Sequence, residues 1–261
     1  MLNYDKDKIK YPAVYDNKYG ITDLEKWERL EFDKTSVRVG ELMTNPGLVK
    51  RTFDSNHLFS IHKYIFQDCY GWAGQMRDNG NRTGANSWSK QRLIDGKCYT
   101  SNYTPDGFLP NRLSEIGNIV KKWTKPDGKY SKEEMLSLLG NVSDTINEIH
   151  LFREGNSRSK REFLRELADT NGYDLDFSKI SVKALTDGEF IANSDYCDGV
   201  DISKMKKERV QILKDLYSPI LSQKEQVEQK SPALQAYIAN KPKNFNSFGA
   251  GKQNVLDNVE E

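Results

Sequence analysis

The sequence predicts a mostly α-helical protein that carries one small β-hairpin before the middle of the chain. Along most of the chain, apolar residues recur at helical spacing in segments separated by Gly, Pro and Asn breaks. Residues 73–100 differ, because turn pairs such as Asn-Gly and Thr-Gly alternate there with isolated apolar residues. That pattern is typical of a hairpin.

The amino-terminal part predicts two helices before the hairpin. Residues 20–45 give the first, which Asn45-Pro46-Gly47 ends. The side chains expected on its apolar face are Leu24, Trp27, Leu30 and Phe32. The second helix begins at a polar cap near Asp54 and ends at Gly71.

The remainder of the chain predicts a further series of helices. Ser131, followed three residues later by Glu134, forms a capping box, and Asn171-Gly172 is a pair that commonly ends a helix. The helices are expected over residues 110–123, 131–149, 157–171, 181–196 and 201–218, with a short one at 231–240.

The composition limits the possible partners and compartment. Of 261 residues, 30% are charged and 36% hydrophobic, which is typical of a soluble folded protein. A net charge of +1 gives no general attraction to nucleic acid or to an anionic membrane, so we expect neither as a direct partner. No apolar run is long enough to span a bilayer. Three widely spaced cysteines indicate reduced thiols, as in a bacterial cytoplasmic protein, although a secreted effector stays open.

The stretch EIHLFREGNSRSKREF, residues 148–163, has the pattern of an anion-binding site. A helix is expected to end near His150, and a new one to begin near Ser157 after a Glu-Gly-Asn loop. The first turn of a helix presents unpaired backbone N–H groups and the positive end of its dipole, an arrangement suited to phosphates. Gly155 would let the backbone approach such a ligand closely.

The charged side chains of this stretch favour phosphoryl or nucleotidyl transfer. Arg158 and Arg161 are three residues apart, so they project from nearly the same helix face, and guanidinium groups bind phosphate oxygens in bidentate fashion. Glu154 offers a hard oxygen ligand for the Mg²⁺ that accompanies a polyphosphate. His150 can take a proton from an attacking hydroxyl near neutral pH.

The same residues carry a family resemblance. The string HLFREGNSRSKR is similar to the Fic motif HxFx(D/E)GNGRxxR, and Ser157 in place of glycine is the single departure at a fixed position. The matching residues are His150, Phe152, Glu154, Gly155, Asn156, Arg158 and Arg161. Two flanking stretches, YIFQDCYGWAGQMR and TNGYDLDFSKI, also resemble the family, so that the resemblance covers roughly residues 55–220.

The resemblance implies a Fic-type helical bundle with a β-hairpin flap over the active site. The flap is expected near Met76–Trp88, where it would align a target segment by main-chain pairing. The implied reaction is transfer of AMP from ATP, with Mg²⁺, to a Ser, Thr or Tyr hydroxyl of a protein, including this one, with release of pyrophosphate. The implied domains are a helical extension over residues 1–50, the catalytic core over 51–225, and a C-terminal helix with a flexible tail over 226–261.

The resemblance also implies a role for each motif residue. His150 would be the general base and Glu154 the Mg²⁺ ligand. Arg161 would bind the γ-phosphate or an inhibitory carboxylate. The remaining phosphate contacts would come from Gly155, Asn156 and Ser157 in the anion hole and from Arg158 at the β- and γ-phosphates.

Two features leave alternatives open. Ser157 is either a tolerated helix-start residue that adds a hydroxyl donor, or a sign of a different reaction. The alternatives to AMP transfer are a protein phosphotransferase of the death-on-curing type and a catalytically silent module that binds nucleotide or a partner. The family's inhibitory pattern (S/T)xxxE(G/N) occurs nowhere in the chain, which predicts a separate antitoxin-like inhibitory partner or a different control. Self-association into a homo-oligomer is also expected from the resemblance.

Overall fold

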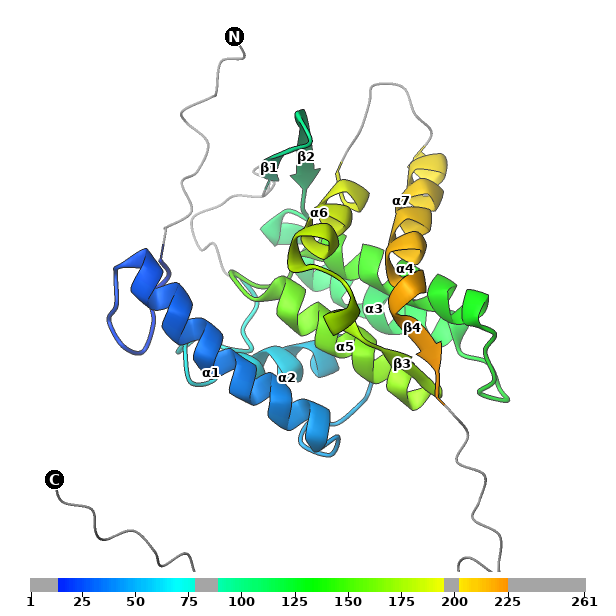
Figure 1. The fold of residues 1–261 in the computed structure, drawn as a ribbon, viewed down its shortest axis with the longest axis horizontal. Coiled ribbons are helices and arrows are strands. Elements are labelled where there is room, and N and C mark those ends of the chain that lie inside the picture. The colour runs from blue at the N-terminus through cyan, green and yellow to red at the C-terminus, as the bar shows by residue number, and fades with distance from the viewer. Residues whose placement is uncertain (1–13, 78–88, 195–201, 225–261) are drawn as a thin grey trace, which may run out of the picture. The chain divides into compact units, whose positions relative to one another are not determined.

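The computed structural model describes residues 14–77, 89–194 and 202–224, all of which belong to one compact unit, Met1–Lys224. Helices dominate, as predicted (Figure 1). In chain order they are α1 (Leu24–Thr44), α2 (Ser55–Phe66), α3 (Leu109–Trp123), α4 (Lys132–Ile149), α5 (Asn156–Thr170), α6 (Val182–Ala192) and α7 (Ile202–Tyr217). The strands are β1 (Ser89–Ile94), β2 (Lys97–Asn102), β3 (Tyr173–Leu175) and β4 (Leu221–Gln223).

Several helix starts are those that the sequence indicates. The Asp54 side chain accepts a hydrogen bond from the His57 N–H at the start of α2, and the Ser131–Glu134 capping box is formed at the start of α4. α2 ends at Phe66, earlier than the predicted Gly71, because the chain enters a run of turns there.

Helix α5 packs against α2, α4 and β3, and Figure 1 shows it in the middle of the helices, with α1 and α2 on one side and α6 on the other. Its buried apolar residues are Phe163, Leu164, Leu167 and Ala168. The same helix also buries charged groups that have partners. Lys160 Nζ lies 2.8 Å from Glu189 Oε1 of α6, and Glu166 Oε2 lies 2.9 Å from His57 Nε2 of α2. These buried pairs hold α5 in one orientation between its neighbours.

The hairpin forms in the later part of the stretch predicted for it, residues 73–100, and extends two residues beyond that stretch. Strands β1 and β2 pair antiparallel from Ser89↔Asn102 to Ile94↔Lys97, around a turn at Asp95-Gly96. Both turn residues have positive φ, 48° and 77°, as a two-residue hairpin turn requires. The expected flap position, Met76–Trp88, stays a prediction, because residues 78–88 lie outside the described residues. Met76 itself lies in the loop before the hairpin.

A second two-stranded sheet was not predicted. β3 pairs antiparallel with β4, with Tyr173 opposite Gln223 and Leu175 opposite Leu221. Strands of three residues are too short to show a two-residue periodicity, so the pattern of apolar residues does not reveal them.

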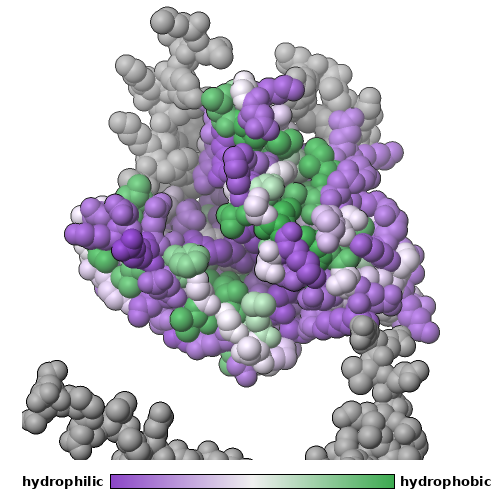
Figure 2. Space-filling model, viewed as in Figure 1, coloured by the Kyte–Doolittle hydropathy of each residue, from purple (hydrophilic) through white to green (hydrophobic). Residues whose placement is uncertain are grey.

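The predicted apolar face of α1 is wrong in part. Trp27 is buried at 3% exposure, but Leu24 and Phe32 are 45% and 68% exposed. The buried face instead includes Glu31 and Thr35. In Figure 2, hydrophobic side chains lie among hydrophilic ones along α1, and others gather over α6. α1 therefore packs through a mixed face, and its polar members have partners in the site described below.

The remaining expectations concern the cysteines, the C-terminal segment, membrane-spanning helices and the domain boundary. Cys69 is buried and Cys98 exposed, both as free thiols. The predicted helix at 231–240 and the C-terminal segment 226–261 lie outside the described residues. Within the ranges that the structure describes, no helix combines the length and the apolar character needed to cross a membrane. The boundary at residue 50 stays a prediction.

Candidate active site

The motif loop begins where α4 ends at His150. His150 adopts the left-handed conformation, with φ 50° and ψ 63°, and its N–H donates to the Ile146 carbonyl at 3.0 Å. Phe152, 1% exposed, fixes the loop to the core. Gly155 precedes α5 with φ 82°, and a Cβ added there would lie 2.3 Å from ring carbons of Phe66. Only glycine suits both the backbone and the space at this position.

The side chain of Asn156 closes the loop. Its Oδ1 accepts from the Phe152 N–H at 2.9 Å, and its Nδ2 donates to the Phe152 carbonyl at 2.7 Å. The same Nδ2 lies 3.3 Å from His150 Nε2. When the imidazole is neutral, this contact makes Nε2 the acceptor and places the proton on Nδ1.

His62 supports the loop from α2. Its Nδ1 accepts from the Gly74 N–H at 2.8 Å, so Nε2 carries the proton and donates to the Glu154 carbonyl at 3.0 Å. The ring stacks on Phe152, with centroids 3.8 Å apart. Burial lowers the pKa of His62 to about 3, against a weaker opposing effect of the Glu154 hydrogen bond. The sequence suggests a structural or surface role for this histidine, and the structure shows the structural one.

The start of α5 has the geometry expected of an anion site. The first intrahelical bond runs from the Ser159 N–H to the Gly155 carbonyl at 3.0 Å. The N–H groups of Asn156, Ser157 and Arg158 therefore precede the hydrogen-bonded turn. Ser157 is the second residue of the helix, is exposed, and has no positive φ. Serine at this position is therefore compatible with the backbone of the loop.

A cavity of about 80 Å³ is lined by His150, Asn156 and Ser157. Tyr103 lines it too, and its ring stacks on the imidazole with centroids 3.8 Å apart. Burial and then the charges of Lys90, Arg77 and Lys160 hold the pKa of His150 well below its usual value. The imidazole is therefore neutral near pH 7, as a general base must be.

Arg158 is held by α1. Its NH2 lies 3.1 Å from Glu31 Oε2 and 3.6 Å from Glu154 Oε1, and its NH1 donates to Thr35 Oγ1 at 3.2 Å. The guanidinium also lies 4.5 Å from the centroid of the Phe66 ring. Glu31 and Thr35 were not predicted as site residues, because nothing in the sequence links a polar residue on α1 to the motif.

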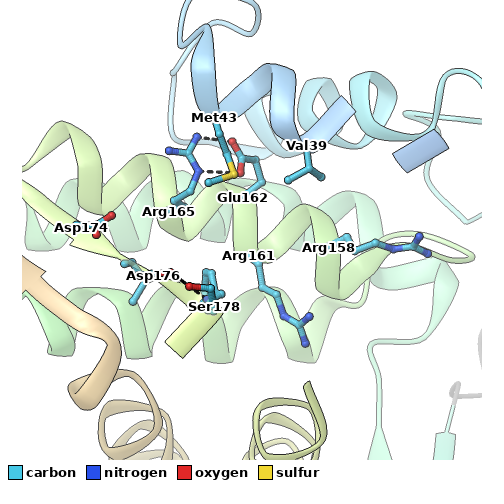
Figure 3. Close-up of a pocket in the computed structure, with 11 residues that line it drawn as sticks. Val39, Met43, Arg158, Arg161, Glu162, Arg165, Asp174, Asp176 and Ser178 are labelled. Carbon is cyan, nitrogen blue, oxygen red and sulfur yellow. Dashed lines mark hydrogen bonds and ion pairs between the residues drawn. The ribbon is translucent and has the colours of Figure 1, made fainter. Parts of the chain in front are cut away.

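Arg161 turns toward α6 instead. Its NH2 lies 3.6 Å from Glu189 Oε2 and 3.4 Å from Thr186 Oγ1. Figure 3 shows the side chains of Arg158, Arg161 and Arg165 leaving α5 in different directions. The three arginines are on the wall of a second cavity of about 630 Å³. Its other lining residues are Val39, Met43, Glu162 and the stretch 174–178.

Glu154 is placed to serve as a metal ligand. Its side chain is 43% exposed, and Oε1 accepts from the Gly155 N–H at 2.9 Å. Mg²⁺ typically binds one or two carboxylates together with substrate phosphates. Among the residues that the structure describes, no cluster of three His, Cys, Asp or Glu forms a ready-made metal cage. A single carboxylate beside a phosphate site suits Mg²⁺ that arrives with a nucleotide.

Two further cavity residues were missed from the sequence. Lys90 of β1 lines the His150 cavity, and Asn193 lies at its edge after α6. Asn193 is 4% exposed, and neither atom of its side-chain amide has a hydrogen-bond partner. A buried amide that lacks partners at a cavity is a group that a ligand can satisfy. No sequence signal distinguishes it from an ordinary residue at a helix end.

Comparison with known proteins agrees with this geometry. Residues 52–168 match the family described as Fic/DOC family. The Probable protein adenylyltransferase y4lH of Sinorhizobium fredii is 31% identical over 194 residues, which are 72% of this chain and 89% of that protein. Protein adenylyltransferase VbhT of Bartonella schoenbuchensis is 28% identical over 174 residues, and the match covers 67% of this chain but only 33% of that longer protein.

The fold is also found in solved structures. The crystal structure of the BepC protein of Bartonella tribocorum, a VirB-translocated effector with bound AMPPNP, matches with a TM-score of 0.60 and 22% identity. The match covers 83% of this chain and 96% of that chain. The shared helical fold, the motif loop and the similarity to y4lH over most of both chains agree, and the chain therefore belongs to the Fic/DOC family.

Proposed function

We propose that this protein transfers AMP from ATP to a Ser, Thr or Tyr hydroxyl of a protein and releases pyrophosphate. The observation that carries the proposal is the single cavity that holds a neutral imidazole, His150, beside the free N–H groups at the start of α5. A base and a phosphate site in one cavity are what nucleotidyl transfer to a hydroxyl requires. The adenylyltransferase names of y4lH and VbhT support the same reaction.

In the proposed reaction the target hydroxyl takes the place of the Asn156 amide at His150 Nε2 and gives its proton to that nitrogen. Its oxygen forms a bond to the α-phosphorus of ATP, and the bond from that phosphorus to the bridging oxygen of the β-phosphate breaks. The electron pair leaves with pyrophosphate. The backbone N–H groups of Asn156 to Arg158 receive the phosphate charge. Before the hydroxyl arrives, the Asn156 amide orients the imidazole. Mg²⁺ held by Glu154 would neutralise phosphate charge when bound.

The nucleotide base has a proposed place at the α6 side of the cavity. Phe190 and Asn193 line that side, the former as an aromatic surface and the latter through its unpartnered amide. An amide can both donate to and accept from the edge of a purine. Purine recognition by Asn193 would favour ATP over pyrimidine nucleotides.

Incubation of the purified chain with labelled ATP and Mg²⁺, followed by mass spectrometry, tests the proposal. We expect an adduct of AMP mass on the chain itself or on a test target, without any glutamate substitution, and no adduct with His150→Ala. An adduct of phosphate mass would favour the death-on-curing alternative. Nucleotide binding without any adduct would leave the silent module.

Partners and localisation stay predictions. A protein target, a homo-oligomer and an inhibitory partner that supplies a carboxylate are proposed on the resemblance alone. The cavity of about 630 Å³ beside Arg158 and Arg161 is the proposed site of such an inhibitor. Binding of a candidate inhibitor that is lost with Met43→Asp, while His150 chemistry persists, would test this site.

A further inference from the structure

The buried side chain of Arg77 lies against the end of α4. Arg77 is 1% exposed, and its Nε donates to the His150 carbonyl at 2.6 Å. Its NH2 donates to the Ile149 carbonyl at 3.2 Å, and its backbone N–H donates to the Leu151 carbonyl at 2.9 Å. One residue thus binds the carbonyls of three consecutive residues centred on His150.

These contacts satisfy carbonyl groups that the end of α4 leaves without hydrogen-bond donors. The last carbonyls of a helix have no intrahelical donors, and a cation near them also complements the helix dipole. His150 has φ 50°, a region that residues with a side chain seldom adopt and that persists only where the surroundings impose it. The planar fork of an arginine can satisfy several carbonyls at once, which a lysine ammonium does less well.

The same guanidinium reaches the base of the hairpin. Arg77 NH2 donates to the Thr104 carbonyl, two residues after the end of β2. Thr104 in turn donates through its N–H to the Glu148 carbonyl of α4 at 2.9 Å. The neighbouring Tyr103 stacks on the imidazole. Arg77 therefore connects the segment that follows β2 to the end of α4.

We propose that Arg77 is the positioning residue of His150: it fixes the backbone of His150 in the left-handed conformation and sets the imidazole between Tyr103 and Asn156. That His150 is a general base rests on the proposed function, whereas the contact between Arg77 and His150 does not. The charged groups that act on the imidazole are Arg77, Lys90 of β1 and Lys160 of α5, all of them cations. Arg77 thus contributes both geometry and charge.

Arg77→Lys and Arg77→Met separate the two contributions. Lysine keeps the positive charge but lacks the planar guanidinium group, whereas methionine lacks both. We expect kcat for AMP transfer to fall about 100-fold in each variant, with the KM for ATP within about twofold, because the base is displaced but the phosphate site is not. Arg51→Met is the matched control, since Arg51 pairs with Glu166 and Asp169 near the far end of α5.

NMR of the imidazole gives a readout that a purely structural role would not move. The chain has three histidines, so His150→Ala assigns the His150 signals directly. We expect altered His150 ring ¹⁵N shifts in both Arg77 variants, a higher titration midpoint in Arg77→Met alone, and neither change in the Arg51 control.

The proposal fails if folded Arg77→Met keeps wild-type kcat and His150 shifts, or if kcat declines only with the folded fraction while the His150 signals of folded molecules stay the same. If Arg77→Met does not fold, Arg77→Lys decides between these outcomes. If the wild-type chain transfers no AMP, the proposed function fails, but the NMR comparison still decides whether Arg77 positions His150.

Discussion

Glu31 Oε2 on α1 lies 3.1 Å from Arg158 NH2 on α5, across 127 residues of sequence. The other carboxylate oxygen of Glu31 accepts a hydrogen bond from the Tyr70 hydroxyl at 2.6 Å. A carboxylate held from both sides fixes the direction of the guanidinium bound to it. Arg158, which we propose as a phosphate ligand, is thus oriented by a helix that lies outside residues 52–168, the part matched by the family.

Glu31→Gln should weaken ATP binding. The amide keeps the shape but loses the charge that orients Arg158, which costs about 1 kcal/mol, or roughly a fivefold higher KM for ATP with kcat little changed. Steady-state kinetics with ATP measure it, and Glu25→Gln, exposed in the first turn of α1, is the control. A lower KM would instead show that Glu31 competes with the phosphates for Arg158.

Gly155→Ala should disrupt the motif loop. A Cβ there would meet the Phe66 ring at 2.3 Å on a backbone with φ 82°. Strain and overpacking together should lower the free energy of unfolding by about 2–4 kcal/mol and reduce transfer more than about 100-fold. Gly128→Ala is the matched control, because Gly128 has φ 63° with no atom within 4 Å. Equal urea stability of the two variants would contradict this account.

Ser157→Gly restores the residue of the family motif and should change little. Ser157 is helical and exposed, so glycine should cost about 0.5 kcal/mol of stability through its lower helix propensity. Loss of one neutral hydroxyl contact to a phosphate should change the KM for ATP by less than about fivefold. Mass spectrometry should still find AMP as the transferred group. A change of transferred group between the two proteins would make Ser157 a determinant of the reaction.

The stability of the protein should fall as the pH is lowered below 6.5. The pKa of His62 is about 3 in the folded chain, against about 6.5 when it is unfolded. Between pH 6.5 and 3, His62 is protonated in the unfolded chain but neutral in the folded one. Each decrease of one pH unit in this range should therefore lower the free energy of unfolding by about 1.4 kcal/mol. Urea titrations from pH 7 to 5 measure this slope. His62→Gln should reduce the slope, and His150, whose pKa is also lowered, should account for part of the slope that remains. An unchanged slope in His62→Gln would contradict the contribution of His62.

Much of the fold follows from patterns within single segments. The α4 capping box and the helix-length apolar periodicities are local, so the sequence alone predicts them. β3 and β4 depend on pairing between distant residues and are too short to show a pattern. The hairpin lies within the predicted stretch apart from its last two residues, but several turn pairs occur there, and the sequence does not show that Asp95-Gly96 is the turn.

The site divides in a similar way. The motif places His150, Asn156 and Ser157 in one cavity, as a contiguous stretch can predict. Glu31 and Asn193 come from helices far along the chain in either direction, and their roles arise only from packing. The partner of Glu31, Arg158, cannot be identified from sequence spacing, because the two residues are 127 positions apart.

The small sheet beside α5 has a consequence for how the protein is made. β3 follows α5 almost directly, but its partner β4 is the last element of the described chain. During synthesis, the motif of residues 150–161 is therefore made before β4, the strand that pairs with β3. A chain that ended after α6 would therefore hold the motif but lack both α7, which packs against α4, and β4, which pairs with β3.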